Sequence, residues 1–404
     1  MTAKLVVRNM LERADDAAMR HVVEAALADE LGDDDVAELA QGLAASGARL
    51  ALDRRAGDVA STGGPSSLST LICPLHLRAR GLKVPKLGVP GRPAGGIDVL
   101  QTIPGFQGVL EPDAAQAALE RSGYIHLLAD KRWAPLDARL FGYRQREGAQ
   151  TVPALVIASI LAKKVAAGAT GAGLEIRVAP HGNFGADLEG ARRNADRYNA
   201  VARLLGLRPV CVLTDATRPY QPYIGRGEAL LALAEVLAGR ARDWLVDHHA
   251  LCQRMADAVA GALGIDTATP VQRTALCQAH DALLAIHGAA ESAFDERVET
   301  VRAAPRTIFR AERSGVVDYD LDRLRDLLVA RQRAEAAQVA GPPPDPVGVI
   351  LETPSGIEVE ADGPLMSVRV PGGEHKLAAE LASCARVRPG QGFEEPARST
   401  LEII

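Results

Sequence analysis

The chain has 404 residues, of which 47% are hydrophobic, and a formal net charge of −5 at pH 7. This length allows two or three domains with a large core, and the lack of any basic run argues against a nucleic-acid partner. No apolar run reaches membrane-spanning length, and the first ten residues lack the apolar segment of a secretion signal. Five scattered cysteines without C-x-x-C spacing are typical of reduced thiols, so we expect a cytoplasmic protein.

The first fifty residues are predicted to be helical, with one long segment over Leu5–Leu31 and a second over Val36–Ala45 that three aspartates precede. Strands and helices then alternate, which predicts an α/β fold with a mainly parallel sheet covered by helices. The expected helices are Leu68–Leu77, Pro112–Ser122, Pro153–Ala167, Leu188–Leu205, Glu228–Leu237 and His248–Leu263, and the expected strands are Leu82–Pro85, Tyr124–Leu128, Leu174–Val178 and Val210–Leu213.

The last third of the chain divides into three predicted segments. Thr269–Ala337 is expected to form helices with polar faces, and the proline-rich Gln338–Pro346 is expected to be a stiff linker. Alternating apolar residues over Val347–Val370 then predict a small C-terminal domain rich in strands.

Two glycine-rich loops each lead into an apolar run. The first begins at Gly63 and the second extends over Gly88–Gly96. Glycine lets a backbone approach a ligand closely, and free N–H groups at a helix start attract anions, so the pair indicates a phosphate or pyrophosphate site. Ordinary turns are the alternative, since neither loop has the spacing of a dinucleotide fingerprint or a P-loop. The polar residues near these loops are Ser66, Ser67, Ser69, Thr70, Lys86 and Arg92.

Several motifs resemble the thymidine and pyrimidine-nucleoside phosphorylases. They are S-T-G-G at Ser61–Gly64, G-R-P-A-G-G-I-D-V-L at Gly91–Leu100, I-P-G-F at Ile103–Phe106, A-P-L-D-A-R-L-F-G-Y-R at Ala134–Arg144, and P-A-L-V-I-A-S-I-L-A-K-K at Pro153–Lys164. V-P-K-L-G around Lys86 is closer to a loop of anthranilate phosphoribosyltransferase, a relative by fold. The resemblance covers roughly residues 30–235 well.

This resemblance implies a discontinuous domain layout. A small helical domain would combine residues 1–50 with 140–170, and a larger α/β domain with a mixed or parallel sheet would combine 51–139 with 171–335. Residues 347–404 would form the C-terminal α+β domain. The resemblance also implies a homodimer, with an interface that we expect on the N-terminal helices.

Three residues match the positions that grip the pyrimidine base in this family: Arg144, Ser159 and Lys163. A pyrimidine edge has two carbonyl oxygens flanking an N–H, so it needs donors for the oxygens and an acceptor for the N–H. Charge gathers on the base as the glycosidic bond breaks, and cationic donors stabilise it most in the transition state. The alternative for Ser159 and Lys163, four residues apart on one helix, is a solvated face.

The phosphate side departs from the family pattern, because the phosphate-binding lysine aligns with Val59 and its histidine neighbour with Ala60. Losing one charge-assisted hydrogen bond costs about 1.5–3 kcal/mol. We therefore expect phosphate to bind weakly, to bind through Lys86 or Arg92, or not to be the co-substrate. The expected substrate-binding residues are Ser61, Thr62, Gly63, Ser66, Thr70, Lys86, Arg92, Gly95 and His181, whereas His248 and His249 are expected on a helix surface.

The function implied is that of a pyrimidine-nucleoside phosphorylase of the thymidine type. Its partners would be a pyrimidine nucleoside or base and phosphate or a sugar phosphate, and no metal-ligand spacing or cofactor motif is present. Two alternatives stay open. One is a related pentosyltransferase that uses a phosphorylated sugar or another acceptor, and the other is a non-catalytic nucleoside-binding or regulatory protein.

Overall fold

The computed structural model describes residues 2–52, 55–62, 64–182, 184–337, 343–390 and 400–404. Its main sheet contains parallel strands β1 (Gly57–Ser61), β4 (Gly171–Val178) and β5 (Arg208–Asp215), with β13 (Thr400–Ile403) antiparallel at the edge of β5. The parallel pair β2 (Val84–Gly88) and β3 (Tyr124–Leu128) continues the sheet through a bridge between Ala56 and Lys83. The predicted α/β class is confirmed.

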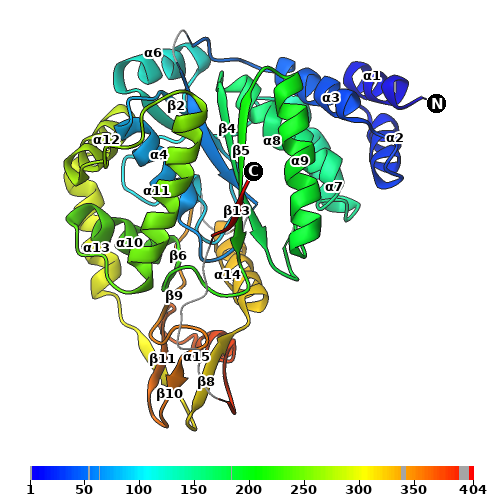
Figure 1. Ribbon diagram of the computed structural model, residues 1–404. Helices are drawn as coiled ribbons and strands as arrows, with labels where there is room; N and C mark the ends of the chain where they lie inside the picture. The colour runs from blue at the N-terminus through cyan, green and yellow to red at the C-terminus, as the bar shows by residue number, and fades with distance from the viewer. Residues whose placement is uncertain (1, 53–54, 63, 183, 338–342, 391–399) are drawn as a thin grey trace.

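Helices cover both faces of this sheet (Figure 1). One face packs against α4 (Ser69–Ala79) and α11 (Trp244–Ala262), and the other against α8 (Pro153–Ala166) and α9 (Leu188–Leu204). The further helices around the sheet are α5 (Gly96–Leu100), α6 (Pro112–Ser122), α7 (Pro135–Arg146), α10 (Arg226–Ala238), α12 (Arg273–Ile286) and α13 (Glu291–Ala303).

Strand β4 shows how the sheet separates two environments. Its apolar Leu174 and Ile176 pack in the core with the N-terminal helices, α8 and α9. Successive strand side chains point to opposite faces, so Glu175 and Arg177 face α4 and α11 instead. Both are buried, at 0% and 4% exposed. The alternation therefore brings two charged groups under the first glycine-rich loop.

The N-terminal region forms three helices rather than two: α1 (Ala3–Arg13), α2 (Asp16–Leu27) and α3 (Asp33–Ala45). The expected helix over Leu5–Leu31 is interrupted at Ala14, whose φ is 50°, and Asp15 caps α2 by accepting from the N–H of Ala18 at 2.8 Å. Helix α3 begins three residues before the expected Val36, so the three aspartates form its first turn, where Asp35 accepts from the N–H of Gly32 at 3.0 Å. Ala14 ends α1 because its left-handed conformation cannot continue a helix.

The segment after α13 corrects the expectation of continuous helices over Thr269–Ala337. Strands β7 (Thr307–Arg310) and β8 (Gly315–Tyr319) precede α14 (Leu321–Ala336). Both strands pair with partners that follow much later in the chain, which no local pattern reveals. The other elements here are β6 (Tyr223–Gly225), β9 (Gly348–Leu351), β10 (Glu358–Val359), β11 (Pro364–Arg369), α15 (His375–Ala382) and β12 (Ala385–Arg388).

These strands form two small sheets, ordered β6-β9-β11-β7 and β10-β8-β12. Of the expected linker, residues 338–342 lie outside the described part of the chain, and residues 343–346 have no regular structure. The predicted domain boundaries stay a prediction. Among the described residues, no helix combines the length and apolarity needed to cross a bilayer.

Candidate functional site

Helices α7 and α8 bring three polar side chains together. Pro153 opens α8, and Ser159 and Lys163 lie one turn apart on it. The Lys163 ammonium donates to Ser159 Oγ at 2.9 Å and to Asp137 Oδ2 at 2.6 Å. Asp137 Oδ1 is buried and has no hydrogen-bond partner within the described chain. The cluster thus offers a cationic donor, a hydroxyl and an unused carboxylate acceptor.

Arg144 is not part of this cluster. It lies two turns beyond Asp137 on α7, and its guanidinium donates to the carbonyls of Ala149 at 3.1 Å, Gln150 at 2.7 Å and Leu155 at 3.0 Å. Burial lowers the pKa of Arg144 to about 10. The structure therefore brings Ser159 and Lys163 together as expected, but it places Asp137 beside them and uses Arg144 to hold the loop before α8.

Lys86 lies in a buried ionic cluster away from the glycine-rich loops. Its ammonium donates to Asp58 Oδ1 at 2.6 Å and to the Val59 carbonyl at 2.7 Å, and Lys164 pairs with the other Asp58 oxygen. Burial alone would raise the pKa of Asp58, but the charges of Lys164 and Lys86 outweigh it and hold that pKa well below 3.8. Burial lowers the pKa of Lys164 to about 8. The Lys86 ammonium is thus bound to Asp58 and to β1, and its role as a replacement phosphate ligand stays a prediction.

The hydroxyls of the first loop bind a carboxylate of the protein itself. Ser69 Oγ donates to Glu175 Oε2 at 2.6 Å, and Ser67 Oγ approaches the same oxygen at 3.1 Å. Thr214 Oγ1 lies 3.5 Å from Glu175 Oε1. We call these three hydroxyls and Glu175 the hydroxyl cage. A carboxylate of the protein therefore takes two of the four hydroxyls, Ser67 and Ser69, that the sequence places in this turn.

The N-terminus of α4 is also satisfied internally. The N–H of Leu68 donates to Nε2 of His248 at 2.8 Å, which requires that nitrogen to be unprotonated. Burial, helped by the charge of Arg177, lowers the pKa of His248 to about 3. His248 is 1% exposed, so the expectation that it lies on a helix surface is wrong.

Ser66 and Thr70 join neighbouring segments. Ser66 Oγ accepts from the N–H of Tyr220 at 3.3 Å, and Thr70 Oγ1 accepts from the N–H of Gly96 at 3.0 Å. Both hydroxyls therefore have partners within the protein, and Thr70 ties the two glycine-rich loops to each other.

The second loop closes on Asp98. The N–H groups of Gly91 and Arg92 donate to its carboxylate at 2.9 and 3.1 Å, and Arg226 adds a third donor at 3.0 Å. Burial raises the pKa of Asp98. A Cβ at Gly95 would lie 2.8 Å from Asp98 Oδ2, so this turn has room only for glycine. Arg92 itself is exposed, and the loop holds Asp98 through its backbone.

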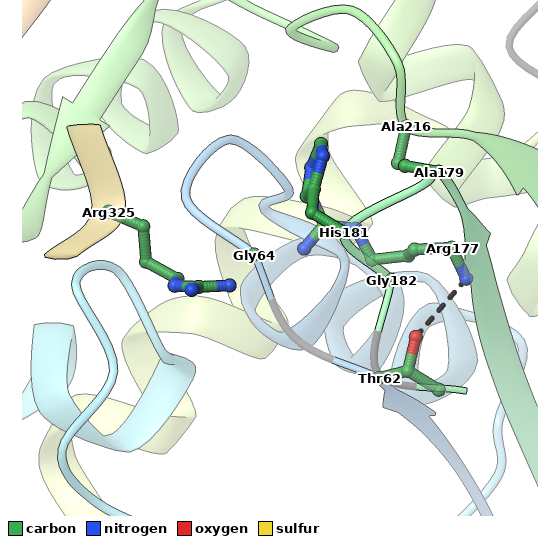
Figure 2. Close-up of a pocket in the computed structure, with 8 residues that line it drawn as sticks. All are labelled: Thr62, Gly64, Arg177, Ala179, His181, Gly182, Ala216 and Arg325. Atoms are coloured by element: carbon green, nitrogen blue, oxygen red, sulfur yellow. Dashed lines mark hydrogen bonds between the residues drawn. The ribbon is translucent and has the colours of Figure 1, made fainter. Parts of the chain in front are cut away.

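A basic pocket opens between the first loop, the end of β4 and α14 (Figure 2). It has about 290 Å³ of space, including the part open to solvent. The guanidinium of Arg177 lies over the Tyr220 ring, 5.1 Å from its centroid, and the N–H of Arg177 donates to Thr62 Oγ1 at 3.1 Å. The lining residues are Thr62, Gly64, Arg177, Ala179, His181, Gly182, Ala216 and Arg325.

This pocket includes two residues of the expected set, Thr62 and His181. Gly63 lies outside the described residues. Ser61 Oγ is buried and has no hydrogen-bond partner among the residues described. Sequence reasoning missed Arg177 and Arg325. The polar positions in the otherwise apolar run L-E-I-R-V were the available signal for Arg177, whereas Arg325 comes from a distant helix that no motif marks.

Comparison with known proteins places the chain among sequences similar to nucleoside phosphorylases, although no family model matches it. It is 27% identical over 336 residues to a thymidine phosphorylase of Burkholderia lata, a match that covers 78% of this chain and 74% of the relative. It is 30% identical over 205 residues to the thymidine phosphorylase of Homo sapiens, covering 48% and 42%. A pyrimidine-nucleoside phosphorylase of Geobacillus stearothermophilus is 25% identical over 227 residues, covering 55% and 52%.

The resemblance that the motifs indicate is thus confirmed. The match spans about half or less of the length of most of these relatives. Among solved structures, an anthranilate phosphoribosyltransferase from Thermus thermophilus matches with 19% identity and a TM-score of 0.47, covering 75% of this chain and all of that one. The enzyme of this name from Saccharomyces cerevisiae matches with 12% identity and a TM-score of 0.46, covering 74% and 91%.

Proposed function

We propose that this protein is a pentosyltransferase that releases a pyrimidine base from a nucleoside and transfers the sugar to phosphate. The observation that carries the proposal is the cluster of Lys163, Ser159 and Asp137. Curated relatives named thymidine and pyrimidine-nucleoside phosphorylase support it.

The cluster matches the edge of a pyrimidine ring. Lys163 supplies a donor for a ring oxygen, and the Ser159 hydroxyl can donate to an oxygen or accept from the ring N–H, while Asp137 holds the Lys163 ammonium in place. When phosphate attacks the anomeric carbon, the bond to the base breaks and its electron pair stays on the base. The ammonium of Lys163 stabilises this developing charge, which lowers the barrier more than it strengthens substrate binding.

The test is a screen of purified protein against pyrimidine nucleosides with and without phosphate. The expected result is free base together with pentose 1-phosphate, formed only when phosphate is present. Release of base without phosphate would contradict phosphate as the acceptor. No release from any nucleoside under either condition would contradict the enzymatic function.

A second candidate is pentosyl transfer that involves a phosphorylated sugar. The hydroxyl cage favours it, because Glu175 is already bound to Ser69 where inorganic phosphate was expected. A sugar phosphate has additional contacts through its ring, so it depends less on this cage. Release of base from a pyrimidine nucleoside 5′-phosphate, with none from the unphosphorylated nucleoside, would then be expected.

We also propose a cytoplasmic homodimer with its interface on the N-terminal helices. Leu5 and Leu27 support this proposal, since they are 53% and 64% exposed and lie on α1 and α2. Burying such side chains gives about 1.5–3 kcal/mol each. Sedimentation at micromolar concentration is expected to give twice the chain mass of 42.6 kDa. A mass equal to one chain would contradict the dimer.

A further inference from the structure

Two hydroxyls next to the first glycine-rich loop and two backbone N–H groups of the second are bound to carboxylates of the protein. The hydroxyl cage holds Glu175, with Ser69 Oγ at 2.6 Å, and the N–H groups of Gly91 and Arg92 are bound to Asp98 at 2.9 and 3.1 Å. A phosphate placed among these groups would meet a buried carboxylate in each loop. Like charges at such a distance repel strongly when they are buried. These four donors are therefore not open to an incoming phosphate.

The basic pocket has the chemistry that the loops lack. Arg177 reaches it from β4, 4% exposed and fixed over Tyr220, and Arg325 reaches it from α14, as Figure 2 shows. Two planar guanidinium groups on opposite sides of a pocket match the bidentate geometry that phosphate oxygens prefer.

Arg325 also has two acidic neighbours on α14, which oppose the binding of an anion. Arg325 pairs with Asp322 at 2.5 Å and with Asp326 at 3.0 Å, but these carboxylates are 47% and 68% exposed. Water therefore screens them more than it screens the buried Arg177. Partial burial and the charges of Arg325 and Arg177 lower the pKa of His181, so its ring is neutral at pH 7 and supplies one N–H donor.

The backbone of the first loop allows the close approach. Gly64 has a φ of 130°, and a Cβ there would lie 2.2 Å from Arg177 Nη1. Only glycine lets the guanidinium lie against the loop, so the loop and Arg177 together form one wall of the pocket. This is a use of the glycine-rich loop that differs from cradling a phosphate with its own N–H groups.

We infer that a phosphate group binds in the basic pocket, between Arg177, His181 and Arg325, rather than at the hydroxyl cage or beside Asp98. This inference rests on the proposed function, for which it names the position of the phosphate-bearing substrate. Inorganic phosphate and the phosphate of a pentose phosphate have the same recognition chemistry here. The test separates these two sources.

The experiment is calorimetric titration of the full chain with inorganic phosphate and, separately, with ribose 5-phosphate. Replacing Arg325 by Gln removes one charge-assisted donor and is expected to weaken binding of the ligand at least about tenfold. His181→Ala should weaken it less, because it removes a neutral donor rather than a charged one. Arg323→Gln is the matched control, since Arg323 is exposed on the same helix and does not line the pocket. Its affinity should equal that of the unaltered protein.

A Ser69→Ala variant tests whether phosphate binds at the hydroxyl cage instead. Binding that survives Arg325→Gln and is lost in Ser69→Ala would overturn the inference, and so would the failure of both ligands to bind at about 10 mM. A preference for ribose 5-phosphate assigns the pocket to a sugar phosphate, and equal affinities assign it to phosphate alone. Circular dichroism of each variant shows whether the fold is retained.

The proposed function and the proposed phosphate site can be contradicted independently of each other. If the pyrimidine base binds through Lys163 but no phosphate ligand depends on Arg325, the position of the phosphate site is wrong and the proposed function stands. If a phosphate ligand depends on Arg325 but no nucleoside releases its base, the site stands and the proposed function is wrong.

Discussion

At the scale of single residues, adjacent lysines of α8 have different surroundings. Lys163 is partly accessible and pairs with Asp137, whereas Lys164 is 3% exposed and pairs with Asp58. One residue corresponds to a rotation of about 100° around a helix, which is enough to turn one ammonium toward the candidate site and the other into the core. The two lysines therefore have separate roles, and only Lys163 is available to a substrate.

Lys163→Ala is expected to reduce turnover of a pyrimidine nucleoside at least about 100-fold, a loss of roughly 2.7 kcal/mol of transition-state stabilisation. The physical reason is the loss of the cation beside the departing base. Steady-state kinetics measures this, with Lys131→Ala as the control because Lys131 is exposed on the surface. Lys164→Ala is unsuitable as a control, since it would leave the buried Asp58 with one partner fewer. Normal turnover in Lys163→Ala would remove this residue from the site.

Arg144→Met is expected to lower the free energy of unfolding by at least about 3 kcal/mol, because three carbonyl groups lose their donor and each buried unsatisfied group costs about 1–3 kcal/mol. Urea denaturation measures the change, and Arg139→Met on the exposed side of α7 is the control. If the stability is unchanged while affinity for the base falls, Arg144 contacts the base directly, as the motif match implies.

At the scale of elements, the sequence pattern predicted local structure well. Both α6 and β3 begin and end at the predicted residues, because each is a short segment with local signals: Pro112 opens the helix, and β3 is a run of buried apolar residues after Gly123. The pattern could not reveal β7, whose partner β11 lies more than fifty residues later.

The same limit applied to the candidate site. Its motifs identified Ser159 and Lys163, which lie on one helix face, but not the partners of the charged groups. Glu175 is found at Ser69 only because strand β4 passes under the first loop in three dimensions. A motif lists residue types, whereas the partner of a charge depends on how distant segments pack.

Three buried histidines should make the stability of the protein sensitive to acid, and one of them, His248, binds the start of α4. Burial lowers the pKa values of His76 and His248 to about 3 and that of His287 to about 4, from an ordinary 6.5. Between pH 6.5 and about 4, these histidines bind protons in the unfolded chain but not in the folded protein. The contribution of these histidines to the free energy of unfolding is therefore fully present above about pH 6.5. It is lost as the pH drops toward 4, by about 1.4 kcal/mol per pH unit for each histidine.

The measurement is urea denaturation at several pH values between 7.5 and 4.5. His248→Gln keeps an acceptor for the Leu68 N–H but cannot be protonated. The free energy of unfolding of this variant should therefore fall less steeply with falling pH, with a slope smaller by about 1.4 kcal/mol per pH unit. An unchanged slope in this variant would show that His248 does not contribute to the acid sensitivity.

At the scale of the whole molecule, a buried ionic network joins α10 to the C-terminal strands. Glu228 is 0% exposed and accepts from Arg369 at 2.8 Å and from Arg306 at 2.7 Å, and Arg369 also pairs with Asp345 at 2.9 Å. A Cβ at Gly348 would lie 1.5 Å from Glu228 Oε2, so the first residue of β9 has to be glycine. The network connects segments that are more than a hundred residues apart.

Glu228→Gln is expected to lower the free energy of unfolding by about 3–5 kcal/mol, because the buried Arg369 and the half-buried Arg306 lose a charged partner. Chemical denaturation of the full chain measures this, and Glu352→Gln, at an exposed position, is the control. A cost below about 1 kcal/mol would mean that water replaces the lost carboxylate and that the network does not hold these segments together.

The hydroxyl cage has a consequence for how the protein responds to its surroundings. Because Glu175 belongs to the chain, it competes for Ser67 and Ser69 at a fixed effective concentration, which for such tethered groups is in the millimolar range or above. Dilution does not remove this competitor, and a free anion has to exceed it before the first loop can respond. The shape of that loop is therefore expected to be the same in phosphate-poor and phosphate-rich solution, so the rise and fall of free phosphate would be sensed elsewhere or not at all.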